Sequence, residues 1–203
     1  MSRERLIIIL ALFALLPITA LAESPTAAAL SYTCAGCHGT DGSSVGPSSP
    51  SIAGMDPEIF IDAMQDYKVD KRNATIMNRI AKAYSDEQIK GMAWYFAKQK
   101  LELLPQSTDT QLVELGTALH DKYCEKCHEE GGRSGDTGTL AGQWMPYLDY
   151  AMEDFIAGRR DYPRKMKRKV DAVIEAEGEQ AMPALIHYYG SQHNSVKKEA
   201  NHE

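Results

Sequence analysis

The sequence predicts an all-α protein made of two small tandem domains behind a signal peptide. Three observations indicate this: an apolar N-terminal segment, a short motif that occurs twice, and apolar residues at helical spacing in both halves. The chain has 203 residues, of which 43% are hydrophobic and 25% charged, as is typical of globular proteins and not of disordered or multi-span membrane chains. A net charge of −6 gives no electrostatic basis for binding nucleic acid.

Residues 1–22 have the pattern of a secretory signal peptide. Arg3 and Arg5 precede an apolar run, and Ala20-Leu21-Ala22 places small residues at the two positions that a signal peptidase reads. We expect cleavage after Ala22, no later membrane span, and a periplasmic protein. The alternative, an uncleaved anchor, is disfavoured because the run is short for a membrane helix and is interrupted by Pro17.

All four cysteines lie in two copies of the pattern Cys-x-x-Cys-His. The first copy consists of Cys34, Cys37 and His38, and the second of Cys124, Cys127 and His128. This is the attachment signature of c-type haem, since two thiols one helical turn apart can each form a thioether and the adjacent imidazole can ligate the iron. A thioredoxin-like redox motif, a zinc site or two disulfides would leave the paired histidines or the repeat unexplained. We therefore predict two covalently attached haem c groups.

The sequence around the motifs is also repeated, which predicts two homologous domains. Ile52-Ala53-Gly54 follows the first motif and Leu140-Ala141-Gly142 follows the second at nearly the same distance. Between the halves, a Leu-Pro-Gln-Ser-Thr-Asp-Thr segment breaks the helical pattern. The predicted organisation is a signal peptide at 1–22, a first domain at 23–102, a linker at 103–111, a second domain at 112–193 and a polar tail at 194–203.

Helical spacing and capping signals predict the individual helices. One helix starts at Pro57 after Asp56, and a capping-box pattern at Ser85 opens a second. Two further helices are expected in the second half, one through residues 147–155 and one over roughly 182–192 that ends at Gly190.

Each predicted haem iron needs a ligand opposite its histidine, and methionine is the usual partner in electron-transfer cytochromes. Met64 and Met152 lie on helix faces expected in the core. Met77 and Met166 follow polar loops and lie at nearly equal distances along the chain after His38 and His128, so we predict these two as the axial ligands. The other histidines, at positions 120, 187, 193 and 202, are expected at the surface or at domain boundaries.

The residues resemble the dihaem cytochrome subunit of flavocytochrome c sulfide dehydrogenase. The resemblance covers about residues 24–192 and is carried by the two haem motifs, the 46–54 stretch, Met77-Asn78-Arg79-Ile80-Ala81-Lys82 and Leu140-Ala141-Gly142-Gln143-Trp144. It implies two class-I-like cytochrome c domains related by a pseudo-twofold axis, with Met77 and Met166 as axial ligands. It also implies that the carbonyl of Pro50 accepts the proton of the first haem-ligating imidazole; Gly138 stands at the matching position of the second half.

The function implied by this resemblance is electron transfer. The chain would accept electrons from a separate FAD-containing, sulfide-oxidising flavoprotein subunit and pass them one at a time to a soluble cytochrome or another acceptor. It would have no catalytic residues and no activity alone. Two alternatives stay open: a free dihaem carrier between a respiratory complex and a terminal oxidase, and a dihaem peroxidase-like enzyme, which the repeated methionine disfavours. The basic run from Arg159 to Lys169 could dock an acidic partner or be a solvated helix end.

Overall fold

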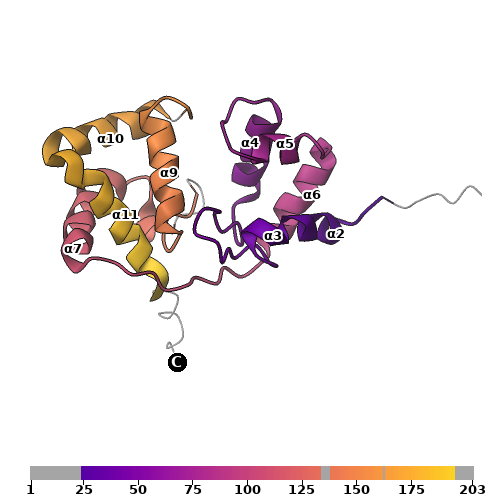
Figure 1. Ribbon diagram of the computed structural model, residues 1–203, viewed down its shortest axis with the longest axis horizontal. Helices are drawn as coiled ribbons and strands as arrows, with labels where there is room; N and C mark the ends of the chain where they lie inside the picture. Colours follow the sequence, from indigo (N-terminus) through magenta and orange to yellow (C-terminus); the bar gives the residue numbers. More distant parts are fainter. Residues whose placement is uncertain (1–23, 134–137, 162, 195–203) are drawn as a thin grey trace, which may run out of the picture.

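The computed structural model describes residues 24–133, 138–161 and 163–194, and the regular elements of these residues are all helical. The predicted signal peptide and nearly all of the predicted tail lie outside the described residues. No described helix is long and apolar enough to cross a membrane. The described chain forms two helical halves that lie side by side, joined by an extended segment that runs along one edge of both (Figure 1).

The first half contains the helices that local signals predict. Asp56 caps α4 by accepting hydrogen bonds from the backbone N–H groups of Glu58 and Ile59. Ser85 and Gln88 form a reciprocal capping box at the start of α6. Both predicted starts are confirmed. The helices of this half are α2 (Ala27–Ser31), α3 (Ala35–His38), α4 (Pro57–Lys68), α5 (Met77–Ala81) and α6 (Asp86–Ala97), with a 3₁₀ turn at Tyr32–Cys34.

The first hydrophobic core lies between α4 and α6. Phe60 and Met64 from α4 pack against fully buried side chains of α6, including Ile89 and Phe96. The rings of Phe60 and Phe96 are 5.7 Å apart. Met64 is 5% exposed, which confirms its prediction as a core residue.

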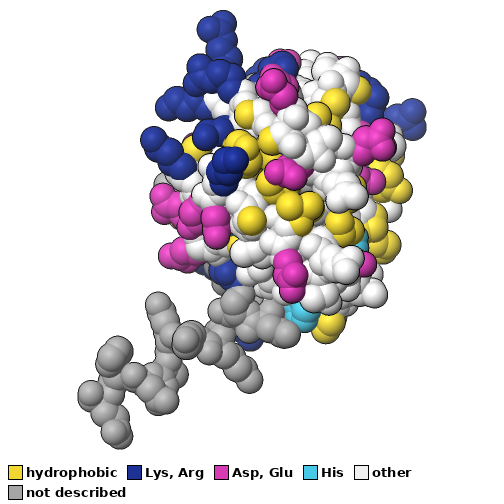
Figure 2. Space-filling view, turned by 90° about the vertical axis from the view of Figure 1, so that its left-hand side faces the viewer, with side chains coloured by type: hydrophobic (Ala, Val, Ile, Leu, Met, Phe, Trp, Pro, Cys, Tyr) yellow, Lys and Arg dark blue, Asp and Glu magenta, His cyan; other side chains and the backbone are white. Residues whose placement is uncertain are grey.

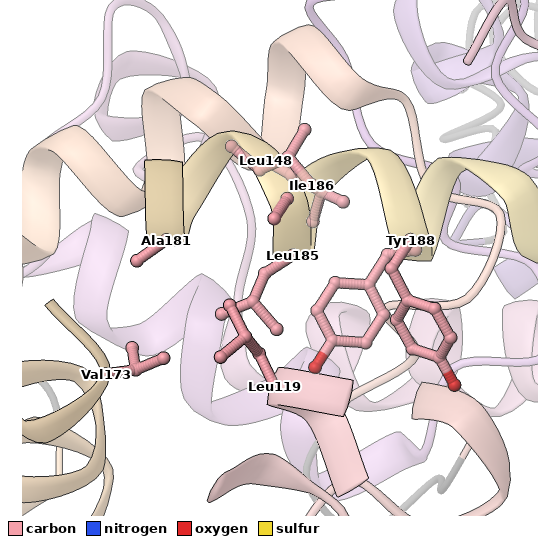
Figure 3. Packing of buried hydrophobic residues seen from close by; sticks show 9 residues of the cluster. Leu119, Leu148, Val173, Ala181, Leu185, Ile186 and Tyr188 are labelled. Carbon is pink, nitrogen blue, oxygen red and sulfur yellow. The ribbon is translucent and has the colours of Figure 1, made fainter. Parts of the chain in front are cut away.

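The second half is built on the packing of α7 against α11. Asp109 caps α7 by accepting from the N–H groups of Gln111 and Leu112, so this helix begins inside the range predicted as linker. The core of this half gathers side chains of α7, α9, α10 and α11, including Leu119, Val173 and Leu185 (Figure 3). The helices are α7 (Thr110–Leu119), α8 (Glu129–Gly132), α9 (Met145–Ile156), α10 (Arg164–Glu177) and α11 (Ala181–Ser191), with a π-helical turn at His120–Cys124.

Glycines allow α11 to approach its neighbours closely. A Cβ at Gly116 of α7 would overlap the backbone carbonyl of Ala184, and a Cβ at Gly190 would lie 2.5 Å from Cγ of Met145. The prediction that the last helix ends at Gly190 is wrong, because α11 continues to Ser191. The glycine is needed there for close packing and not for chain termination.

The loop after each haem motif has the same hydrogen-bond pattern in both halves. The carbonyl of Gly42 accepts from the N–H groups of Ile52 and Ala53, and the carbonyl of Gly132 accepts from those of Leu140 and Ala141. Gly42 and Gly132 have φ values of 88° and 89°, which favour glycine. The sequence repeat is therefore also a structural repeat.

The two halves are joined by buried polar contacts. The side-chain amide of Gln143 in the second half donates to the carbonyl of Ser51 at 2.8 Å and accepts from its N–H at 2.9 Å. Trp144 donates through Nε1 to the carbonyl of Ser44 at 2.9 Å. Gln106, from the connecting segment, bonds the carbonyl of Gln143 and the N–H of Met145. Gln143 and Trp144, two of the residues that carry the family resemblance, thus make the main contacts between the halves among the described residues.

Candidate functional site

The first Cys-x-x-Cys-His motif begins in a 3₁₀ turn and ends in α3. Cys34 packs against the first core, whereas Cys37 is exposed, and the two thiols are not joined in a disulfide. Burial raises the pKa of the Cys34 thiol. A thioredoxin-like motif requires a strand-helix-strand context, and the regular elements of the described residues are all helical, which disfavours that alternative.

His38 is held in the orientation that a metal ligand requires. Its side chain is buried, and its Nδ1 lies 2.8 Å from the carbonyl oxygen of Pro50, to which it donates. This is the contact that the family resemblance implies. The bond fixes the ring and leaves Nε2 as the nitrogen for a metal. Burial lowers the pKa of His38, which favours the neutral imidazole that binds iron.

The second motif has a different backbone. Helix α7 continues into the π-helical turn at His120–Cys124, and His128 is not helical, with φ −119° and ψ 64°. Cys124 packs against the second core and Cys127 is exposed, as in the first half. Burial raises the pKa of Cys124 and lowers that of His128. Gly138 adjoins residues 134–137, which lie outside the described residues, so its relation to His128 stays a prediction.

The two predicted axial methionines lie in different surroundings. Met77 is the first residue of α5 and packs against the same core as Cys34. Met166 is half-buried in the first turn of α10, while the methionines that pack against the second core, among the described residues, are Met145 and Met182. The structure therefore brings Met77 to the core that its own motif packs against, whereas Met166 is not among the described residues that pack against the second core. Both ligand assignments stay predictions.

His120 is the residue whose place the sequence analysis missed. It was expected near the surface, but it is fully buried: its Nε2 bonds the Glu125 carboxylate and its Nδ1 lies 3.1 Å from the hydroxyl of Tyr189. Its ring also packs on that of Tyr188, 4.8 Å away. A signal was present, because His120 lies one helical turn after Gly116 and so extends the buried face of α7.

These donor sets fit two covalently attached haem groups. Each half offers one core-facing thiol and one exposed thiol beside an imidazole whose pKa burial lowers. The thiols could form thioethers at one edge of a porphyrin, and the imidazoles could ligate the iron.

Comparisons with known proteins point to the same cofactor. No family model matches the chain. It is 30% identical over 166 residues to cytochrome c4 of Pseudomonas aeruginosa, covering 75% of this chain and 82% of that one. It is 49% identical over 67 residues to the cytochrome subunit of sulfide dehydrogenase of Chlorobaculum tepidum, covering 33% of this chain and 60% of that one. The crystal structure of reduced cytochrome c4 from Pseudomonas stutzeri is similar, with a TM-score of 0.71 and 25% identity over 82% of this chain and 97% of the other.

These relatives confirm three predictions. The fold is all-α with two class-I-like cytochrome domains, the resemblance to dihaem cytochrome subunits is correct, and the chain carries two covalently attached haem c groups.

Proposed function

Because the chain belongs to the cytochrome c4 family of dihaem c-type cytochromes and carries electrons, we propose that it is the electron-accepting subunit of a sulfide-oxidising, FAD-containing enzyme. The observation that carries this proposal is the 49% identity, over 67 residues, to the cytochrome subunit of sulfide dehydrogenase. That match covers only part of either chain, so the flavoprotein partner and the substrate belong to the proposal. We place the mature chain in the periplasm.

We assign the haem-binding roles to the residues of the two motifs and the two methionines. Cys34 and Cys37 attach the first haem, and Cys124 and Cys127 the second. The iron ligands are His38 with Met77, and His128 with Met166. The haems supply reversible one-electron reduction, and a methionine ligand raises the potential relative to two histidines.

The chain's own residues would hold these groups in a fixed arrangement. The Pro50 carbonyl orients the His38 ring, and the adjacent Ser51 is bonded on both backbone groups by Gln143 of the other half. The orientation of the first iron ligand is therefore supported from the second half. A two-electron donor such as a reduced flavin must release its electrons singly, and two docked haem domains can accept both in succession.

A free dihaem carrier is the second candidate. Several relatives aligned over most of the chain are cytochromes c4, and the surface has a feature suited to transient docking. Lys and Arg side chains gather at one end of the second half (Figure 2), and α10 contributes exposed basic residues there. These are Arg164, Lys165, Lys167, Arg168 and Lys169. A basic patch of this kind favours rapid, salt-sensitive association with an acidic partner.

Purification of the native protein from periplasmic extract distinguishes the two candidates. Gel filtration with absorbance read for both haem and flavin would show whether the haem chain co-elutes with a larger flavin-bearing chain. Reduction of the haems in that fraction by added sulfide supports the proposed subunit. A lone haem protein that sulfide does not reduce would contradict it and favour the free carrier.

A further inference from the structure

Two positions next to the haem motifs differ in character between the two halves. Leu30 lies four residues before the first cysteine of its motif, and His120 lies four residues before the first cysteine of the second. Ala35 and Glu125 directly follow these cysteines. Both positions are therefore apolar in the first half and polar in the second.

A third position changes in the same way. The carbonyl of Phe96 accepts from the N–H of Gly54 at 2.8 Å, and the carbonyl of Tyr189 accepts from the N–H of Gly142 at the same distance, so the two aromatic residues match. The second half thus has an imidazole, a carboxylate and a phenol where the first half has two aliphatic side chains and a phenyl ring.

The three polar residues of the second half form one hydrogen-bonded chain. The N–H of Glu125 donates to the carbonyl of His120 at 2.9 Å, which closes the π-helical turn and brings their side chains together. In the first half, the N–H of Ala35 donates instead to the carbonyl of Tyr32 in a 3₁₀ turn. The imidazole bonds the Glu125 carboxylate through Nε2, and its Nδ1 lies 3.1 Å from the hydroxyl of Tyr189.

This chain leads from the solvent to the second haem motif. The Glu125 side chain is 45% exposed, His120 is fully buried, and Tyr189 is 6% exposed. Tyr189 also interacts with the thiol of Cys124, the first cysteine of the motif. A proton from solvent can therefore enter at the Glu125 carboxylate, and the chain ends beside the predicted attachment of the second haem.

The chain can hold one more proton with every ring nitrogen still paired. When the imidazole is neutral, Nε2–H donates to Glu125 and the Tyr189 hydroxyl donates to Nδ1. When it is charged, both nitrogens donate, one to Glu125 and one to the Tyr189 oxygen. The hydrogen bond from His120 lowers the pKa of the Glu125 carboxyl and burial raises the pKa of Tyr189, so the carboxylate stays ionised and the phenol keeps its proton.

We propose that Glu125, His120 and Tyr189 form a proton-binding site that couples reduction of the second haem to the uptake of one proton. One electron converts the ferric iron to ferrous iron, and one proton from solvent binds the imidazole, so the total charge around the haem is unchanged and no other bond forms or breaks. The first half has apolar residues at the matching positions, so its haem lacks this coupling. The proposal rests on the assignment of Cys124 to haem attachment.

Other charged or titratable groups surround the site or the thiol of Cys124. They are Asp121, His128, Glu130, Arg133, Lys169 and Tyr188. The first five are retained in every variant used below, so any pH dependence that they cause stays in all of them.

The test is a spectroscopic redox titration of the holoprotein between about pH 5 and 8, the range in which imidazoles titrate. Haem-methyl NMR signals assign each step to one haem. A protonated site favours the negative charge that reduction adds, so reduction of the second haem should become less favourable as the pH rises. We expect the equilibrium constant for its reduction to fall about tenfold over this range, which is about 59 mV for one electron, while that of the first haem changes less.

A combined variant gives the second half the residues of the first: His120→Leu, Glu125→Ala and Tyr189→Phe. This variant should abolish the pH dependence of the second haem. Glu125→Gln keeps a hydrogen-bond acceptor but loses the charge that stabilises a protonated imidazole, so it should remove most of the dependence. Tyr188→Phe is the matched control, because it removes a neighbouring hydroxyl while the ring stays stacked on His120, and it should titrate as the wild type does.

Two results would overturn the proposal. One is a wild-type protein whose second haem has no pH dependence, or no more than the first. The other is a dependence of wild-type size in the combined variant and in Glu125→Gln, which would assign it to other groups such as the haem carboxylates. If the combined variant does not retain both haems, as shown by its mass, Glu125→Gln alone decides. Peptide mapping of the haem-bearing cysteines tests the assignment of Cys124 separately.

Discussion

Replacement of Gln143 by leucine should uncouple the two halves. The Gln143 side chain and Ser51 are 4% and 5% exposed, and the amide makes two hydrogen bonds to the Ser51 backbone. Leucine has a similar size but cannot form either bond. If the halves stayed docked, a buried N–H and a buried C=O would both be left unpaired, at about 1–3 kcal/mol each.

The docked arrangement of the halves should therefore lose about 2–6 kcal/mol of stabilising free energy if water is kept out. It should lose about 1–3 kcal/mol if the halves part enough for water to reach Ser51. We expect a value of about 3 kcal/mol, which corresponds to roughly a hundredfold decrease in the docking equilibrium constant. In calorimetry of the holoprotein, the first unfolding transition should move to a lower temperature. The two halves should then unfold in separate steps, because each half has its own hydrophobic core.

Gln99→Leu is the matched control. Gln99 is half-buried and its amide donates to the carbonyl of Tyr95 at 2.9 Å, within the first half. This variant should lower the stability of the first half slightly and leave the coupling of the halves intact. If Gln143→Leu unfolds in the same steps and at the same temperatures as Gln99→Leu, the inference that the Gln143 amide links the halves is refuted.

Three further outcomes are expected. Met77→Ala should abolish the iron–sulfur charge-transfer band of one haem and allow that iron to bind carbon monoxide, as measured by absorbance. Gly116→Ala should destabilise the second half by about 1–3 kcal/mol or more in a denaturant titration, because the new methyl group would overlap the Ala184 carbonyl. The hydrogen bond from His120 lowers the pKa of the Glu125 carboxyl below its ordinary value of 4.5, so this group stabilises the fold above pH 4.5 and the stabilisation is lost as the pH falls; Glu125→Gln should flatten this acid limb of thermal stability.

Each of these variants has a control. Met64→Leu replaces a core methionine and should leave both haem spectra unchanged, at a stability cost below about 1.5 kcal/mol. Gly46→Ala places a methyl group where nothing lies within 4 Å, so it should not destabilise the fold as Gly116→Ala does. Glu114→Gln removes an exposed carboxylate of α7 and should keep the acid limb of the wild type. A reversal of any of these contrasts would contradict the corresponding reasoning.

The parts of the fold that the sequence predicts well are those with a local physical cause. The starts of α4 and α6 follow from side chains that bond their own first turns, Asp56 and Ser85. The Cys-x-x-Cys-His motifs predict the haems because the required groups are adjacent in the chain. The apolar spacing of residues 147–155 likewise predicts α9.

The parts that could not be predicted depend on contacts between distant residues. Gln143 and Ser51 are 92 residues apart, and no local pattern marks a glutamine that will bond another domain's backbone. Glycine is typical of a helix end, but the role of Gly190 is determined by its packing against Met145. His120 is polar and is predicted at the surface or at a domain boundary, but its position on the buried face of α7 and its bond to Glu125 keep it inside.

The differences between the halves are as informative as the repeat. The loop after each motif has the same hydrogen bonds in both halves. The surroundings then diverge: at the matching position before each motif stands Leu30 in the first half and the buried, hydrogen-bonded His120 in the second. Polar groups near a haem alter the stability of its charged states, so the two haems of one repeated fold do not share one environment. We therefore expect the two haems to differ in reduction potential, which a spectroscopic redox titration of the holoprotein would show as two separate steps.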